Sequence, residues 1–197
     1  MMRRLRRGLG VAALGALAAS PAGATTLVRA GLDAMTASSG TIVHGEVLGA
    51  RSYWNADHTF ILTDVRIAPR EVLKGSAGSE LTLTLLGGSV GDRTVMVVGG
   101  AELRPGQAYV VFVGEDDLPG RVGVQTVPGH AQGVFEVQKR ADGGWRAVSQ
   151  ANDHSMVPDA LGRTEVPGGR EGLALPALLD TIRQAVARDA VTPGGTR

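Results

Sequence analysis

Residues 41–54, TIVHGEVLGARSYW, and residues 58–67, HTFILTDVRI, decide the predicted fold of this chain. Residues 55–57, Asn-Ala-Asp, are types that form tight turns, so the two stretches predict a β-hairpin. In the second stretch β-branched side chains occupy alternate positions, which places them on one face of a pleated strand. These side chains are Thr59, Ile61, Thr63, Val65 and Ile67. We expect Pro69 to end this strand and residues 70–80 to form a bend or short loop.

Further stretches predict strands of the same kind. The sequence LTLTL at residues 81–85 alternates strictly, so its leucines should face the core and its threonines the solvent. Two apolar runs, RTVMVV at 93–98 and QAYVVFV at 107–113, show no alternation, and we expect both to be buried on two sides. The remaining candidate strands are residues 121–127, 133–138 and 145–148.

Strands that follow one another without intervening helices predict an antiparallel sheet. We therefore expect a mainly β protein whose centre, about residues 40–150, is an antiparallel OB-like β-barrel. A β-sandwich is the alternative, because both architectures bury alternate residues. Residues 32–38 predict a short helix before the barrel. A C-terminal amphipathic helix is predicted by apolar residues at helical spacing, which are Leu175, Leu178, Leu179, Ile182 and Val186.

The first residues have the composition of a secretory signal peptide. Residues 1–24 contain a basic part, MMRRLRRG, an apolar part, LGVAALGALAA, and a small-residue part, SPAGA, in the required order. The apolar part is about half of the roughly 20 residues that a membrane-spanning helix needs. We therefore expect cleavage after Ala24 and export to the periplasm or the extracellular space. The predicted organisation is a signal peptide at 1–24, a β-barrel domain at 25–150, an irregular connection at 151–172, a C-terminal helix at 173–192 and a tail at 193–197.

Charge and composition exclude several classes of function. The chain has no cysteine, so disulfides, thiolate metal sites and a cysteine nucleophile are excluded. It has 20 basic and 19 acidic residues, but four arginines lie within the first eight positions. Without these four the chain has 16 basic and 19 acidic residues, and it lacks the basic surface expected of a nucleic-acid binder. We expect no nucleic-acid partner and, once the signal peptide is removed, no membrane span.

No catalytic motif has its required context. Residues 87–91, GGSVG, match G-x-S-x-G, but a nucleophile elbow needs a helix after its serine, and the residues after Ser89 predict a strand. A glycine-rich β-turn is the favoured interpretation. No paired metal-binding spacing links the four histidines, which are His44, His58, His130 and His154. We expect no enzyme, no catalytic residue, no bound metal and no cofactor. The alternative is a small hydrolase that uses Ser89 or a metal held by His44, His58 or His130.

The aromatic residues suggest one contact surface. Phe60, Tyr109, Phe112 and Phe135 lie within apolar runs and are predicted to be core residues. Tyr53 and Trp54 end the first long strand beside a turn, where side chains are accessible. We predict that these two residues contribute to ligand binding.

Four segments carry a resemblance to a known group of proteins. They are VRAGLDAMTASSGTIVHGEVLGARSYW (28–54), TFILTDVRIAPREVLKGSAGSELTLTLLGG (59–88), ELRPGQAYVVFV (102–113) and GHAQGVFEV (129–137). In this order the chain resembles a group of uncharacterised exported bacterial proteins over about residues 27–138. The group is similar in architecture to the OB-like barrel of netrin modules and tissue inhibitors of metalloproteases. The resemblance implies a partner among secreted metalloproteases.

If a metalloprotease is the partner, the N-terminus that signal-peptide cleavage would create is a candidate contact. The inhibitors grip the catalytic zinc through an N-terminal cysteine, whereas cleavage here would leave Thr25, followed by Thr26. A free amine has a pKa of about 7.7–8.0, so a fraction is neutral near pH 7–8 and able to ligate zinc. The alternative is that residues 25–30 form an edge strand that completes the barrel.

These observations favour an exported, non-catalytic binding module that recognises a protein or an extracellular polymer, with a secreted metalloprotease or a component of the cell envelope as the expected partner. An inhibitor or accessory protein of a secreted metalloprotease is the second interpretation. The predicted ligand-binding residues are Thr25, Thr26, Tyr53 and Trp54.

Overall fold

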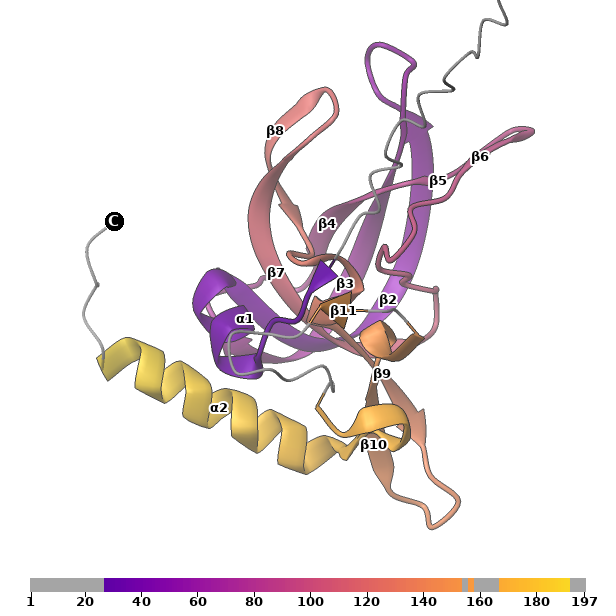
Figure 1. The fold of residues 1–197 in the computed structure, drawn as a ribbon. Helices are drawn as coiled ribbons and strands as arrows, with labels where there is room; N and C mark the ends of the chain where they lie inside the picture. The colour runs from indigo at the N-terminus through magenta and orange to yellow at the C-terminus, as the bar shows by residue number, and fades with distance from the viewer. Residues whose placement is uncertain (1–26, 154–155, 158–166, 192–197) are drawn as a thin grey trace, which may run out of the picture.

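The computed structural model describes residues 27–153, 156–157 and 167–191. Its main sheet contains β2 (Thr41–Trp54), β3 (Ile61–Lys74), β4 (Leu81–Leu86), β7 (Ala108–Leu118), β9 (Val134–Lys139), β10 (Trp145–Ser149) and β12 (Leu173–Ala174), with β8 (Arg121–Thr126) paired to β7. The strand order is β12-β10-β9-β7-β2-β3-β4, and every pairing within it is antiparallel. The chain is therefore mainly β, as predicted (Figure 1).

The smaller elements lie around this sheet (Figure 1). They are the parallel pair β1 (Leu27–Val28) and β11 (Met156–Val157), the hairpin of β5 (Gly88–Val90) and β6 (Arg93–Val95), the helices α1 (Leu32–Ser38) and α2 (Leu175–Val191), and the 3₁₀ turns η1 (His130–Gly133), η2 (Gln150–Asp153) and η3 (Gly169–Glu171). Neither helix in the described part of the chain has the length and apolar character of a membrane span.

The sheet is open at one seam. Among the described residues no hydrogen-bonded ladder joins β4 to β8. The Arg121 side chain of β8 instead bridges this seam, because it donates hydrogen bonds to Thr84 of β4 at 3.4 Å and to Tyr53 of β2 at 2.6 Å. These contacts bury Thr84, which the alternating sequence had placed in solvent. The contact partner of Thr84 comes from a distant segment, so strand alternation alone gave the wrong exposure.

Pro69 does not end β3, which continues to Lys74. Pro69 lies opposite Gly45 of β2, where the register of the β2–β3 pair shifts. A Cβ at Gly45 would stand 2.6 Å from the Ala68 carbonyl oxygen, so glycine permits the close backbone approach at this irregularity. Pro lacks a backbone donor and is tolerated at such breaks in the ladder. The predicted bend therefore begins at Gly75 rather than at Arg70.

The two helices cover one face of the sheet. α1 has the predicted bounds, and α2 buries its predicted apolar stripe from Leu175 to Ile182. The core between helices and sheet contains Met35, Ile42, Leu73, Val110, Phe112, Phe135, Val137, Ala147, Leu175, Leu178, Leu179 and Ile182. Burying such side chains contributes about 1.5–3 kcal/mol each relative to exposure. This core fixes the position of β7 and β9.

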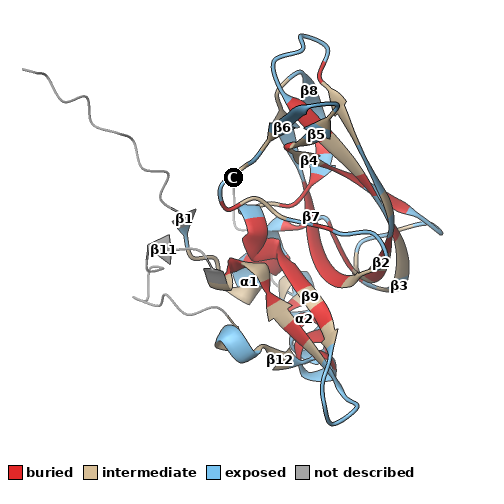
Figure 2. Cartoon of the chain, turned by 90° about the vertical axis from the view of Figure 1, so that its right-hand side faces the viewer, coloured by how far each residue is buried: buried red, intermediate tan, exposed pale blue. Residues whose placement is uncertain are grey.

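A second core lies on the other face. It contains Val43, Val47, Val65, Ile67, Leu81, Leu83, Leu103, Tyr109, Val111, Val113, Val127 and Val134. Because β7 contributes to both cores, its residues from Tyr109 to Val113 are buried on two sides, as predicted. Figure 2 shows buried positions along β7 and β9 and exposed positions at the tip of the β9–β10 hairpin.

The apolar run at residues 93–98 behaves differently from the prediction. Only Arg93–Val95 forms a strand, and among the described residues it pairs with β5 alone. Met96 is 85% exposed and Val98 is 92% exposed. The expectation that this run is buried on two sides is therefore wrong, because no second strand in the described part of the chain covers it.

The N-terminal segment is held beside the main sheet and does not extend it. Leu27 and Val28 pair with Met156 and Val157 in the separate two-stranded sheet. The buried Gln132 amide accepts a hydrogen bond from the Ala30 amide at 2.7 Å and donates one to the Val28 carbonyl at 3.0 Å. The described part of the predicted edge strand at 25–30 therefore does not complete a barrel.

Candidate functional site

A loop that we call the strap, residues 96–104, connects β6 to β7 and lies against the second core. Leu103 is its buried anchor. The Gly99 carbonyl accepts a hydrogen bond from the Ala131 amide at 2.9 Å, which ties the strap to η1. The Arg104 amide donates to the Tyr109 hydroxyl at 3.1 Å, which ties its other end to β7. The strap is thus fixed at three points by residues of the sheet and its connections.

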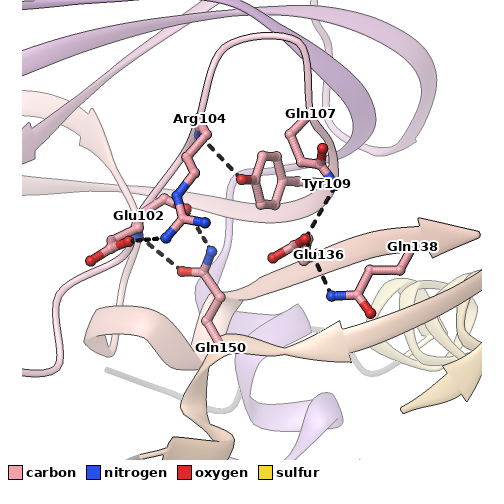
Figure 3. A network of polar contacts seen from close by, with 7 residues as sticks. All are labelled: Glu102, Arg104, Gln107, Tyr109, Glu136, Gln138 and Gln150. Carbon is pink, nitrogen blue, oxygen red and sulfur yellow. Dashed lines mark hydrogen bonds and ion pairs between the residues drawn. The ribbon is translucent and has the colours of Figure 1, made fainter. Parts of the chain in front are cut away.

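Gln150 holds the middle of the strap. Its side-chain amide accepts a hydrogen bond from the Glu102 backbone N–H at 2.9 Å and donates one to the Glu102 carbonyl at 2.5 Å. The same side chain therefore satisfies both backbone groups of one residue, as a neighbouring strand would (Figure 3). This contact joins segments that are 48 residues apart in sequence.

A groove of about 520 Å³ lies between the strap and the strands β9 and β10. The strap contributes one wall, with residues 96–100, Glu102 and Arg104. The other side contains Glu136, Gln138, Val148, Ser149 and Gln150. One side of the groove is thus rich in apolar and glycine residues, and the other is rich in carboxamide and carboxylate groups.

The polar side chains of this groove form a fixed network (Figure 3). Glu102 and Arg104 form an exposed ion pair at 2.9 Å. The hydrogen bond that Arg104 donates to the Glu102 carboxylate raises the pKa of the Arg104 guanidinium. Burial raises the pKa of the Tyr109 hydroxyl, so this group stays a neutral acceptor for the Arg104 amide.

Glu136 is the charged residue of this network that forms no close ion pair among the described residues. Its Oε1 atom accepts hydrogen bonds from the side-chain amides of Gln107 at 3.1 Å and Gln138 at 3.2 Å. Within the described chain no ion pair involves Glu136, because both of these donors are neutral amides. Neutral amides orient a carboxylate without cancelling its charge. Glu136 therefore presents an oriented negative charge at the floor of the groove.

The rim of the groove is apolar. Met96 and Val98 line it and are the most exposed large apolar residues of the strap. Two further hollows adjoin the strap, one of about 320 Å³ toward β3 and β4 and one of about 440 Å³ toward β7, β8 and η1. Val97 and Gly100 line all three, so the strap is the element around which these hollows are arranged.

The predicted binding residues Tyr53 and Trp54 lie away from this groove, at the end of β2. The Tyr53 hydroxyl accepts a hydrogen bond from Arg121 and donates one to Asp64 at 2.9 Å. Trp54 stacks on His58 with ring centroids 6.3 Å apart. Tyr53 is thus used to hold β2, β3 and β8 together, and the role of this pair in ligand binding stays a prediction.

The predicted contact residues Thr25 and Thr26 lie outside the described residues. The interpretation that the new N-terminus grips a metalloprotease stays a prediction that the structure does not address.

The residues of the hydrolase alternative do not come together. Ser89 lies in the β5–β6 hairpin, and its hydroxyl hydrogen-bonds the Thr94 hydroxyl at 2.8 Å. The strand-like context predicted after Ser89 is thus confirmed. His44 lies on β2 beside Glu71, His58 lies in the β2–β3 turn, and His130 begins η1. In the described ranges no group of three histidine or carboxylate side chains is arranged to hold a metal ion.

Comparisons of the chain with models of known protein families, with curated proteins and with solved structures gave no significant match.

Sequence reasoning missed the strap and its groove. A signal was present, because Gly99-Gly100 follows the apolar run and predicts a loop rather than a continuing strand. The polar side of the groove left no comparable signal, since Glu136 and Gln150 belong to separate segments of the sequence.

Proposed function

We propose that this protein is an exported, non-catalytic binding module of OB type that holds a segment of another protein in the groove beside the strap. Export rests on the order of basic, apolar and small residues in positions 1–24. The single observation that carries the binding role is the pair of exposed apolar side chains, Met96 and Val98, at the rim of a hollow with a fixed polar floor.

The order of five strands supports the OB interpretation. β2 lies between β3 and β7, while β4 and β8 lie at the two open ends. A five-stranded, partly open Greek-key barrel has this arrangement. The contacts of Arg121 with Thr84 and Asp64 bring the two ends together at one point.

Exposure of the strap supports a protein ligand. Apolar side chains exposed at a rimmed hollow are typical of interaction sites. Methionine adapts its shape to different partners and is common on such surfaces. A segment that buries Met96 and Val98 would gain about 1.5–3 kcal/mol for each side chain that becomes fully covered.

The floor of the groove indicates the chemistry of that segment. Glu136 presents a carboxylate that forms no ion pair with the described residues, and Gln138 and Gln150 supply carboxamides that match peptide groups. The Glu102–Arg104 pair is neutral overall. The preferred segment therefore combines apolar side chains with one lysine or arginine.

Selection from a displayed library of random peptides tests the proposal. We expect the recovered peptides to combine apolar residues with a basic one, and synthetic versions to bind about tenfold or more weakly to a Met96→Ser/Val98→Ser variant. Glu136→Gln should remove the preference for the basic residue.

Val122→Ser is the matched control, because Val122 is also 85% exposed but lies on β8 and lines none of the three strap hollows. Recovery of no specific peptide, or equal weakening by Val122→Ser and by the strap variant, would overturn the proposal.

A further inference from the structure

The β9–β10 hairpin carries a separate hollow, of about 350 Å³, whose lining shares no residue with the strap groove. Lys139, Arg140 and Ala141 come from the hairpin, Arg146 from β10, and Glu171 and Gly172 from the segment before β12. Three of these six residues are cations and one is an acid, so the hollow is positively charged, whereas the chain without its four N-terminal arginines has 16 basic and 19 acidic residues.

Arg146 is held in a fixed orientation at this hollow. Its Nε and one terminal nitrogen donate to the Gln138 side-chain oxygen at 3.2 and 3.0 Å, and the other terminal nitrogen donates to the Glu171 carbonyl at 3.4 Å. Each terminal nitrogen carries a second N–H, for which the described residues supply no acceptor. A guanidinium fixed in this way is prepared to bind a carboxylate with two parallel hydrogen bonds.

Lys139 and Arg140 provide the other two charges. Arg140 forms an exposed ion pair with Asp142 at 3.2 Å, and such pairs contribute little and exchange partners readily. Lys139 is exposed, and in the described part of the chain it forms no ion pair. Both cations are therefore available to a ligand.

Trp145 lies beside Lys139 and outside the lining of the hollow, so a ligand must extend past the hollow to reach it. It is the register partner of Lys139 across the hairpin, and it is 48% exposed. The core does not use this side chain, since Trp145 belongs to neither buried cluster. An exposed indole offers a flat apolar surface with a polar edge, which suits the C–H face of a sugar ring.

We propose that the β9–β10 hairpin binds a polysaccharide whose sugars carry carboxylates. The carboxylates would contact Arg146, Arg140 and Lys139, and a sugar ring would stack on Trp145. Asp142 and Glu171 lie among these cations and would repel a densely charged polyphosphate. A polymer with one carboxylate per sugar has the lower charge density that this mixed surface accepts. The linings of the two hollows share no residue, and Gln138, which lines the peptide groove and accepts hydrogen bonds from Arg146, is left unchanged in every variant that tests this proposal.

Tryptophan fluorescence measures this binding directly. The chain has two tryptophans, so a Trp54→Phe background leaves Trp145 as the only indole. We expect titration with polygalacturonate to change the Trp145 emission at low salt, and neutral dextran to leave it unchanged. The response should weaken as salt is added, because exposed charges are screened.

Paired variants identify the residues responsible. Lys139→Ala/Arg140→Ala should weaken polygalacturonate binding about tenfold or more. Trp145→Ala should weaken it in an assay of direct binding, such as affinity electrophoresis. The matched control is Arg51→Ala/Arg93→Ala, which also removes two exposed positive charges but from other strands. This control should stay within about twofold of the parent at the same ionic strength.

Three results would each overturn the proposal. They are an unchanged Trp145 emission with polygalacturonate, an equal loss of binding in the Arg51/Arg93 control, and binding of double-stranded DNA as tight as that of polygalacturonate. All four substituted cations are exposed, so these variants are expected to fold, and the far-ultraviolet circular dichroism of each checks this.

Discussion

Two short apolar runs of nearly the same composition differ in burial in this molecule. Residues 95–98 read VMVV and residues 110–113 read VVFV. The second run is buried throughout, whereas the first includes Met96 and Val98, the most exposed large apolar residues of the strap. The comparison shows that burial depends on the strands that lie beside a run, and not on its hydrophobicity alone.

The neighbours of the two runs explain the difference. Residues 110–113 pair with β2 on one side, and Val110 and Val111 pair with β9 on the other. Their side chains therefore enter the two cores alternately. The first run has a partner only at Val95, opposite Gly88. An uncovered apolar run at the rim of a hollow is typical of a contact surface, which is why we place the proposed protein ligand there.

The largest expected effect is a difference in stability between a substitution in the buried run and one in the exposed run. Phe112→Ala should lower the free energy of unfolding by about 3–5 kcal/mol, because it leaves a cavity beside Phe135, whose ring centroid lies 6.1 Å away. Val98→Ala should change it by less than about 0.5 kcal/mol. Urea denaturation of both variants measures the difference. Similar losses in the two variants would contradict the assignment of the strap as an exposed element.

The second effect concerns the strand that covers the buried run. Gly45 of β2 pairs with Tyr109, and an added Cβ would stand 2.6 Å from the Ala68 carbonyl oxygen and 2.8 Å from the Ile67 side chain. Gly45→Ala should therefore destabilise the fold by about 1–3 kcal/mol. Gly40→Ala is the control, since a Cβ at Gly40 has open space around it. Thermal unfolding of the pair provides the test, and a control as destabilised as Gly45→Ala would count against the close approach.

The third effect concerns how the exposed run is held. Gln150→Ala removes both hydrogen bonds to the Glu102 backbone. A hydrogen bond of this kind contributes about 0.5–1.5 kcal/mol, so the Glu102 amide should exchange with solvent severalfold faster. Amides of β7 should keep their protection. Hydrogen exchange followed by nuclear magnetic resonance measures both, and an unchanged rate at Glu102 would show that the strap is fixed without Gln150.

The smallest effect is a pH dependence on β2, directly beside the buried run. His44 pairs with Val110, and its buried Nε2 atom has no hydrogen-bond partner among the described residues. Burial and, to a smaller extent, Arg70 lower the pKa of His44 below its usual value of about 6.5, while Glu71 acts in the opposite direction. The unfolded chain therefore binds a proton at this residue more readily than the folded chain does.

It follows that the contribution of His44 to stability is present above pH about 6.5 and is lost as the pH falls toward the lowered pKa of the folded state. His44→Gln should show a shallower loss of stability below pH about 6.5 than the parent protein. Urea titrations at a series of pH values measure this slope. Parallel slopes in parent and variant would contradict the lowered pKa.

The local sequence determined the elements whose signal lies within one segment. The bounds of β2 and α1 and the apolar stripe of α2 follow from alternation, turn residues and helical spacing. The burial of residues 109–113 also followed from the sequence, although the same reasoning was wrong for residues 93–98. A periodic pattern states which residues are apolar, and it does not state which strands will cover them.

Only the tertiary structure decided the seam and the two proposed binding surfaces. Arg121 reaches Tyr53 across 68 residues of sequence, and Gln150 reaches Glu102 across 48. The passage of β3 through Pro69 likewise depends on Gly45 in the neighbouring strand. Contacts of this kind arise from how distant strands pair. The free energy that favours one strand pairing over another comes from side chains of both cores, and no single segment of the sequence contains it.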